Sequence, residues 1–247
     1  MLAKAYLDAA QAALAWARQE NLDRINEVAG WLTTALQAGG ILWVFGSTHA
    51  SIPAQELFYR AGGLVPINPL FAPGLVTTVR PITLTSELER VAGYGQLVVE
   101  QSRVEAGDVV IVVSVSGRNS VPIDVALAAK QRRAKVIAVT SVAYSQVVAS
   151  RHPSGKRLCD LNLDAVLDIG GCPGDAAIAI PRTAVRSGPT SSIVAIYLLN
   201  ALVVEVAGQL VAAGWNPPPV FISANMEGGD QHNRELLKRY GNRLTYL

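Results

Sequence analysis

Short, continuous runs of apolar residues recur along the chain, each closed by glycine or small polar residues. The three clearest runs occupy residues 41–45, 109–113 and 135–139. An apolar run of this length without polar alternation is typical of a strand covered on both faces of a parallel sheet. We expect further short strands at residues 64–67, 165–169 and 177–180, and a strand or turn at 220–223.

Helical periodicity fills the segments between these runs. In residues 1–38, Leu7, Leu14 and then Val28 and Leu32 mark apolar stripes, which Gly39 and Gly40 end. The same spacing predicts the remaining helices at residues 51–61, 87–101, 122–133, 189–213 and 230–240. Residues 68–85 contain prolines and little periodicity, which predicts a long loop.

The repeated order of strand, loop and helix predicts parallel strands with right-handed crossovers. We therefore expect one doubly wound α/β domain over residues 1–247. It would comprise an N-terminal helical extension (1–38), an α/β core (39–214) and a C-terminal tail (215–247). Ligands bind at the C-terminal ends of the strands in such sheets, so the loops that begin at Gly46, Ser114 and Thr140 are candidate ligand loops.

Composition narrows the class of protein. The chain has 247 residues, of which 50% are hydrophobic and 16% charged, which excludes a disordered chain. A net charge of +2 and an aromatic content of 6% give no reason to expect a nucleic acid or an acidic membrane surface as partner. Cys159 and Cys172 form neither a CxxC motif nor a disulfide framework, and residues 1–20 lack the ordered zones of a signal peptide. We expect a cytoplasmic protein.

The apolar segment at residues 193–213 is long enough to raise the question of a membrane span. Asn200, Glu205 and Gln209 interrupt it. A carboxylate near the middle of a bilayer costs about 2.5–3.5 kcal/mol on insertion scales. We therefore interpret the segment as a helix of the core or of a subunit interface. Because it is apolar on most faces, we also expect a homo-oligomer.

The most informative loop follows the strand at 109–113. Its polar groups are the hydroxyls of Ser114, Ser116 and Ser120 and the amide of Asn119, and Gly117 permits a close backbone approach. A loop that leaves a strand and enters a helix presents free N–H groups and the positive end of the helix dipole to an anion. The alternative is a helix N-cap with spare serines.

Residues 108–141 carry the pattern S-x-S-G-x-N, then a helix, then the strand KVIAVTS, and they resemble the sugar isomerase (SIS) domain. Further segments resemble an uncharacterised bacterial family of SIS-domain proteins. These are ELFYRAGGL (56–64), HPSGKRL (152–158), GPTSS (188–192) and PPVFISANMEGGDQHN (218–233).

The resemblance implies a five-stranded, mainly parallel sheet flanked by helices, in dimers or tetramers, and no cofactor. Members of the family isomerise sugar phosphates, cleave an ether of a muramic acid phosphate, or only sense sugar phosphates. By this resemblance the loop residues Ser114, Ser116, Gly117, Asn119 and Ser120 bind phosphate. The sugar would lie against Ser47, Thr140, Thr190, Ser191 and Ser192, although the last three also suit a helix cap.

The first loop departs from the family pattern. The family has a Gly-His-Ser form here, whereas this chain has Thr48 where glycine is expected and Ala50 where serine is expected. The loop keeps His49 but has lost a hydroxyl beside the sugar. The departure puts either the ligand or the activity in question.

An isomerase needs a base that moves a proton between neighbouring carbons. The candidates are Glu56, Glu205 on its apolar helix, and His49 as an acid or base that opens the sugar ring. Each has a structural alternative: a solvated or interface glutamate, a satisfied interface carboxylate, or a structural histidine. His152 and His232 lie in polar segments that could reach a partner subunit's site.

We expect no metal site, because three dispersed histidines and two unpaired cysteines lack ligand spacing, although His49, His152 and Asp175 could meet in space. The sequence therefore leaves two main hypotheses. The first is a cofactor-independent phosphosugar isomerase or related lyase, and the second is a sugar-phosphate sensor or partner subunit without turnover. A structural oligomer without a ligand is a third.

Overall fold

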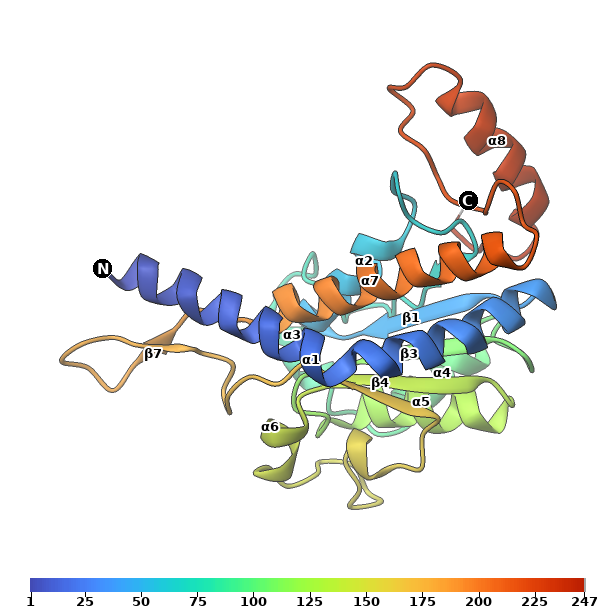
Figure 1. The fold of residues 1–247 in the computed structure, drawn as a ribbon. Coiled ribbons are helices and arrows are strands. Elements are labelled where there is room, and N and C mark those ends of the chain that lie inside the picture. The colour runs from blue at the N-terminus through green and yellow to red at the C-terminus, as the bar shows by residue number, and fades with distance from the viewer. Residues whose placement is uncertain (247) are drawn as a thin grey trace.

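Five parallel strands form the centre of the molecule in the computed structural model, which describes residues 1–246. They are β1 (Leu42–Gly46), β2 (Ile67–Pro69), β3 (Val109–Val113), β4 (Lys135–Thr140) and β5 (Ala165–Asp168). Their order in the sheet is β2-β1-β3-β4-β5 (Figure 1). The expected doubly wound, five-stranded parallel sheet is confirmed.

Each central strand is buried on both faces, which explains why its sequence shows no polar alternation. In β3, Val109, Ile111 and Val113 join one core cluster, and Val110 and Val112 join the other. Burial of a Val or Ile side chain contributes about 1.5–3 kcal/mol. A polar residue at any of these positions would therefore oppose the packing of one of the two helical layers.

The helices cover the two faces unequally. One face is covered by α1 (Leu2–Gln37), α2 (Ile52–Leu57) and α7 (Ser191–Ala212), and the other by α4 (Tyr94–Glu100) and α5 (Ser120–Gln131). Figure 1 shows α1 and α7 side by side across the sheet. By length and composition α7 could cross a membrane, but Leu198, Leu202 and Val206 are buried in the core.

Several expected elements have different bounds. The expected helix at 87–101 is wrong as a single element. Gly93, at a φ of 85°, separates α4 from α3 (Thr83–Leu88) because such a backbone conformation does not continue a helix. The helix expected at 51–61 ends at Leu57, after a short 3-10 turn, η1 (Thr48–Ser51). The second strand begins at Ile67, and Leu64 instead forms an isolated bridge with Val220.

The remaining elements lie at the periphery. They are α6 (Val142–Gln146), the 3-10 turn η2 (Leu158–Asp160), β6 (Ile178–Ala179), β7 (Arg186–Ser187) and α8 (Gly229–Tyr240). The β6–β7 hairpin extends beside the N-terminal end of α1 (Figure 1). The Tyr6 hydroxyl of α1 donates a hydrogen bond to the Pro189 carbonyl over 2.8 Å, which holds the base of the hairpin next to the start of α7.

Asp108 ties the C-terminal tail to the opposite end of the sheet. Its buried carboxylate accepts hydrogen bonds from the Ile41 N–H and Trp43 Nε1, each over 2.8 Å. Arg243 Nη2 donates to both carboxylate oxygens over 2.8 and 3.0 Å. Burial raises the pKa of Asp108, and the Ile41 and Trp43 donors oppose that rise. The network sits at the N-terminal end of β3 and leaves the C-terminal edge free for a site.

Candidate functional site

The C-terminal edge of the sheet has a crevice between β1 and β3. The chain runs outward from β1 to the edge strand β2 and then returns past β1 to β3. The loops that follow β1 and β3 therefore leave the sheet in opposite directions, and a crevice opens at such a reversal of strand order. A cavity of about 400 Å³ lies there. Its walls are formed by Ser47, Thr48, His49, Ala50, Glu89, Ser114, Val115, Ser116, Asn119, Tyr144, Gly174, Asp175, Pro189, Ser191 and Ser192.

The loop after β1 turns unusually tightly. A Cβ atom on Gly46 would lie 1.8 Å from the Ala50 carbonyl oxygen, so only glycine allows this turn. Thr48 has a φ of 54°, in the left-handed region that favours glycine, and its N–H donates to the Leu75 carbonyl over 2.7 Å. The turn places Ser47 and His49 on the cavity wall, Ser47 buried and His49 exposed.

The loop after β3 is fixed by backbone contacts with two other segments. The Val115 carbonyl accepts from the Ser141 N–H over 2.9 Å and from Thr140 Oγ1 over 3.2 Å. The Gly117 carbonyl accepts from the Leu158 N–H over 2.8 Å. These contacts hold the loop at the start of α5, so its cavity-lining hydroxyls and the helix N-terminus point to the same region.

The start of α7 forms the opposite wall, and Asp175 caps it. Asp175 Oδ1 accepts from the N–H groups of Thr190 and Ser191, both over 3.1 Å. Its Oδ2 accepts from Ser191 Oγ over 2.5 Å. A carboxylate at a helix N-terminus satisfies free N–H groups and the helix dipole. The cap fixes Ser191 and Ser192 against the cavity.

Glu89 supplies a carboxylate that the sequence interpretation missed. It follows α3, lines the cavity and is partly buried. Burial raises the pKa of its carboxyl; the Asn119 amide, the charges of Arg151 and Arg90, and the Ser47 hydroxyl lower it by less. The Ser47 hydroxyl lies beside the carboxyl but makes no hydrogen bond of good geometry with the described residues 1–246. A carboxyl with a raised pKa beside free hydroxyls is suited to proton transfer.

The expected ligand residues divide into two groups. The cavity is lined by Ser47, His49, Ser114, Ser116, Asn119, Ser191 and Ser192. Gly117, Ser120, Thr140 and Thr190 lie behind it and support the loops: Ser120 Oγ donates to the Arg151 carbonyl over 3.2 Å, for example. Tyr144 also lines the cavity and was not expected there.

The two expected glutamate bases lie away from the cavity. Glu56 forms an ion pair with Arg60 and accepts a hydrogen bond from Asn200 over 3.4 Å. Glu205 accepts from Gln209 over 3.1 Å on the same helix. Neither is among the described residues that line the cavity, so the structure does not bring them to this site.

His152 and His232, which could reach a partner subunit's site according to the sequence, both make contacts within their own chain. His152 Nε2 lies 3.0 Å from Asp124 Oδ1, and His232 Nε2 lies 3.0 Å from the Val220 carbonyl oxygen. Within residues 1–246, His, Cys, Asp and Glu side chains do not gather in a group of three that could hold a metal ion.

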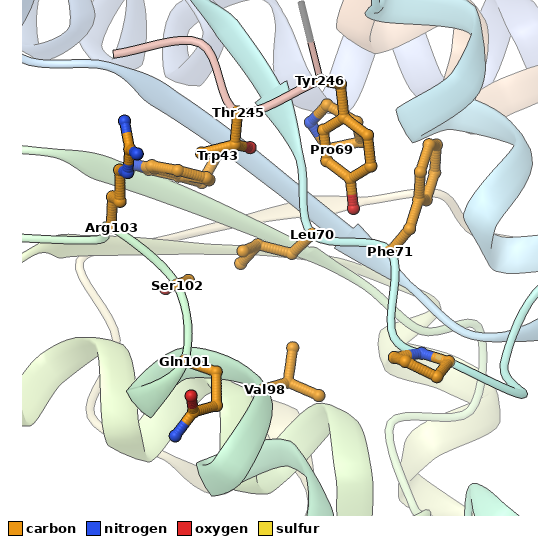
Figure 2. A pocket seen from close by; sticks show the side chains of 11 residues that line it. Trp43, Pro69, Leu70, Phe71, Val98, Gln101, Ser102, Arg103, Thr245 and Tyr246 are labelled. Atoms are coloured by element: carbon orange, nitrogen blue, oxygen red, sulfur yellow. The ribbon is translucent and has the colours of Figure 1, made fainter. Parts of the chain in front are cut away.

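A second cavity, of about 410 Å³, lies beside the edge strand β2 (Figure 2). Trp43, Leu70, Phe71 and Tyr246 give it an apolar wall, and Arg103 is the one charged side chain among the described residues that line it. Among the described residues that line it there is no carboxylate, and it is not bordered by a loop such as that after β3, whose hydroxyls lead into the N-terminus of α5. The crevice between β1 and β3 is therefore the candidate site for chemistry.

Comparison with known proteins identifies the family of the chain. The SIS domain family matches residues 5–141. UPF0309 protein ABC0887 of Shouchella clausii is 44% identical over 228 residues, 92% of each chain. UPF0309 protein SCO4393 of Streptomyces coelicolor is 40% identical over 98% of this chain and 96% of its own.

Solved structures share the fold. The phosphoheptose isomerase GmhA from Neisseria gonorrhoeae has a TM-score of 0.52 at 19% identity, covering 83% of this chain and 97% of its own. The Vibrio vulnificus NanR protein complexed with ManNAc-6P has a TM-score of 0.51 at 16% identity, covering 99% of this chain and 70% of its own. At these identities the likeness concerns the fold. The family match and the two close relatives together show that the chain belongs to the SIS domain family and, within it, to the UPF0309 proteins.

Proposed function

We propose that the protein binds a sugar phosphate in the crevice between β1 and β3 and isomerises it without a cofactor. One observation carries the proposal: a loop with hydroxyl groups at the start of α5 and a partly buried carboxyl with a raised pKa line the same cavity. The SIS family match supports the ligand class. The cavity volume of about 400 Å³ falls within the usual range for small-molecule sites.

The phosphate would lie in the loop after β3. Ser114, Ser116 and Asn119 offer donors to its oxygens, and the first turn of α5 adds N–H groups and the helix dipole. The sugar would extend toward Ser191 and Ser192 at the start of α7. Two walls of hydroxyl groups suit a ligand with many hydroxyls of its own.

Glu89 is our candidate for the base. In an aldose–ketose isomerisation, a carboxylate removes the proton from the carbon beside the carbonyl, which leaves an enediolate. It then returns the proton to the neighbouring carbon. The raised pKa of Glu89 favours this role because a stronger base removes such a proton more readily. His49, exposed on the cavity wall, is placed to exchange a proton with the sugar oxygen.

The first experiment is a thermal-unfolding screen with sugar phosphates and their unphosphorylated parents. A ligand at 100 times its dissociation constant stabilises the fold by about 2.7 kcal/mol. A phosphosugar that raises the midpoint in the native chain but not in Ser114→Ala would support the phosphate loop. Equal effects of a sugar and its phosphate would contradict it.

The second experiment measures turnover as incorporation of deuterium from ²H₂O into the bound phosphosugar. Glu89→Gln should reduce the exchange rate by about 10²–10⁴-fold. Glu87→Gln is the matched control, because Glu87 is exposed near the end of α3, two residues before Glu89, and does not line the cavity. Equal exchange in both variants would remove Glu89 from the mechanism.

Binding without turnover is the second candidate function. The first loop favours it: Ala50 lines the cavity where the family pattern has a hydroxyl, and His49 is exposed. A sensor needs the phosphate loop but no base. Tight binding with no deuterium exchange in the native protein would favour this function over isomerisation.

Self-association through α7 is part of the proposal. Ile193, Tyr197, Val204 and Val211 lie on this helix with exposed fractions of 41%, 38%, 70% and 48%. An apolar helix face of this kind supports an interface with a second copy. Sedimentation should show an oligomer that Val204→Glu dissociates, and a 26.1 kDa species alone in the native protein would refute it. The two free thiols, Cys159 and Cys172, support a reducing, cytoplasmic location.

A further inference from the structure

Three arginines gather beside the phosphate loop, outside the contacts used so far. Arg90 follows Glu89, Arg118 lies within the loop after β3, and Arg151 comes from the segment before η2. Arg151 contacts Arg118 through the backbone. Burial lowers the pKa of Arg151 most, and the nearby positive charges of Arg118 and Arg90 lower it further. Glu89 is the one carboxylate among the described groups that act on Arg151. The group therefore carries more positive than negative charge.

The segment that carries Arg151 is fixed against the phosphate loop. The Arg151 N–H donates to the Arg118 carbonyl over 2.8 Å, and Ser120 Oγ donates to the Arg151 carbonyl over 3.2 Å. The next residue, His152, contacts Asp124 of α5 over 3.0 Å, and both of these side chains are largely buried. The backbone of Arg151 is therefore held by hydrogen bonds at both its N–H and its carbonyl group.

One contact links this charge to the cavity wall, and one buried donor of the group has no partner in the described part of the chain. Arg151 Nη1 donates to Asn119 Oδ1 over 2.9 Å, and Asn119 lines the cavity. Arg118 Nε is buried and has no hydrogen-bond acceptor among residues 1–246. A buried donor without a partner and a group of like charges are both unfavourable unless an anion joins them.

We propose that Arg90, Arg118 and Arg151 form a second anion site at the mouth of the cavity, and that the ligand is a sugar phosphate with a second acidic group. The inference rests on the proposed function, because the first phosphate occupies the loop after β3. Guanidinium groups bind carboxylate and phosphate oxygens with paired hydrogen bonds. Either group would satisfy the site, and the test distinguishes them.

The test is isothermal titration of the full chain with three probes. D-fructose 6-phosphate carries one anionic group, D-fructose 1,6-bisphosphate adds a phosphate, and 6-phospho-D-gluconate adds a carboxylate. We expect one doubly acidic probe to bind about tenfold more tightly than fructose 6-phosphate, since hydrogen bonds to charged groups contribute at least this factor. The probe that binds more tightly than fructose 6-phosphate identifies the second acidic group as phosphate or carboxylate.

The test compares the affinity of the doubly acidic probe with that of fructose 6-phosphate, and Arg151→Gln should bring the ratio of these two affinities close to one. A merely structural role for Arg151 would weaken all three probes equally and leave the ratio unchanged. Lys156→Gln is the matched control. Lys156 is exposed in the same segment, and its substitution also removes one positive charge but leaves the three arginines unchanged. It should preserve the ratio.

The outcomes separate the two proposals. If fructose 6-phosphate binds through Ser114 and neither doubly acidic probe binds more tightly, the second anion site is overturned and the proposed function stands. If a doubly acidic probe binds more tightly but Arg151→Gln keeps the ratio, the assignment to these arginines is overturned. If none of the three probes binds, the proposed ligand class and the second anion site both fall.

Discussion

Gly117→Ala tests whether the loop after β3 is held as the structure has it. Gly117 has a φ of 61°, a conformation that costs an L-residue about 1–2 kcal/mol. An added Cβ would also lie 3.1 Å from the Leu158 Cβ and 3.3 Å from Thr140 Oγ1. Leu158 and Thr140 are both fully buried, so neither moves away easily. We expect a destabilisation of about 2 kcal/mol from strain and close contact together.

Thermal unfolding and titration measure the two consequences. For a chain of this length, a loss of about 1 kcal/mol in the free energy of unfolding lowers the thermal midpoint by about 2–4 °C. The midpoint of Gly117→Ala should therefore fall by about 4–8 °C. The loop should also shift away from Leu158, which would displace Ser116 and Asn119 from the proposed phosphate position. Sugar-phosphate affinity should therefore fall with stability, even at temperatures where the variant is fully folded.

Gly155→Ala is the matched control. Gly155 has a φ of 71°, but an added Cβ would meet nothing within 4 Å. This variant should show the effect of backbone strain alone. Its free energy of unfolding should fall by about 1 kcal/mol, and its ligand affinity should not change. If Gly117→Ala matched Gly155→Ala in both stability and affinity, the close packing of the loop against Leu158 would be refuted.

Three further substitutions test other parts of the structure. Since burial raises the pKa of Glu89 in the fold, its ionised form opposes folding, and Glu89→Gln should raise the unfolding midpoint at pH 7. The gain should vanish below the carboxyl pKa of the unfolded chain, and a gain that persists at acid pH would contradict this origin. Asp175→Asn should cost about 1 kcal/mol by weakening the cap of α7; an unchanged denaturant midpoint would disprove the cap. Asp108→Ala should cost about 3–5 kcal/mol, because the buried Ile41 N–H and Trp43 Nε1 lose their acceptor and Arg243 loses one of its two carboxylate partners. A loss below 1 kcal/mol in urea unfolding would show that the network contributes little.

The strands could be predicted from the sequence because burial on both faces requires a continuous run of apolar residues. The run at 109–113 matches β3 residue for residue, since Asp108 and Ser114 bound it with polar groups. The break between α3 and α4 left no such trace. Gly93 lies within an otherwise helical pattern, and a helix interior tolerates an occasional glycine, so the pattern does not reveal its φ of 85°.

The candidate site was predictable where it depends on topology. The rule that ligands bind at the C-terminal ends of parallel strands identified the loops at Gly46 and Ser114, and both line the cavity. The direction of individual side chains was not predictable. Thr140 ends β4 and Ser114 follows β3, yet Thr140 donates to the Val115 carbonyl while Ser114 lines the cavity.

Glu89, our proposed base, was the hardest residue of the site to find from the sequence. Nothing in its neighbours distinguishes it from Glu87, and its raised pKa comes from burial against segments far away in the sequence. Its position nevertheless has a topological cause. The chain leaves β2 at Pro69, on the same edge of the sheet as Ser47 and Ser114, and must pass this edge before it returns to β3. The phosphate loop therefore depends on a strand end, whereas the carboxylate depends on the irregular connection between β2 and β3. If the proposed function holds, a change confined to that connection would remove the base and leave phosphate binding intact, and this would separate an isomerase from a sensor.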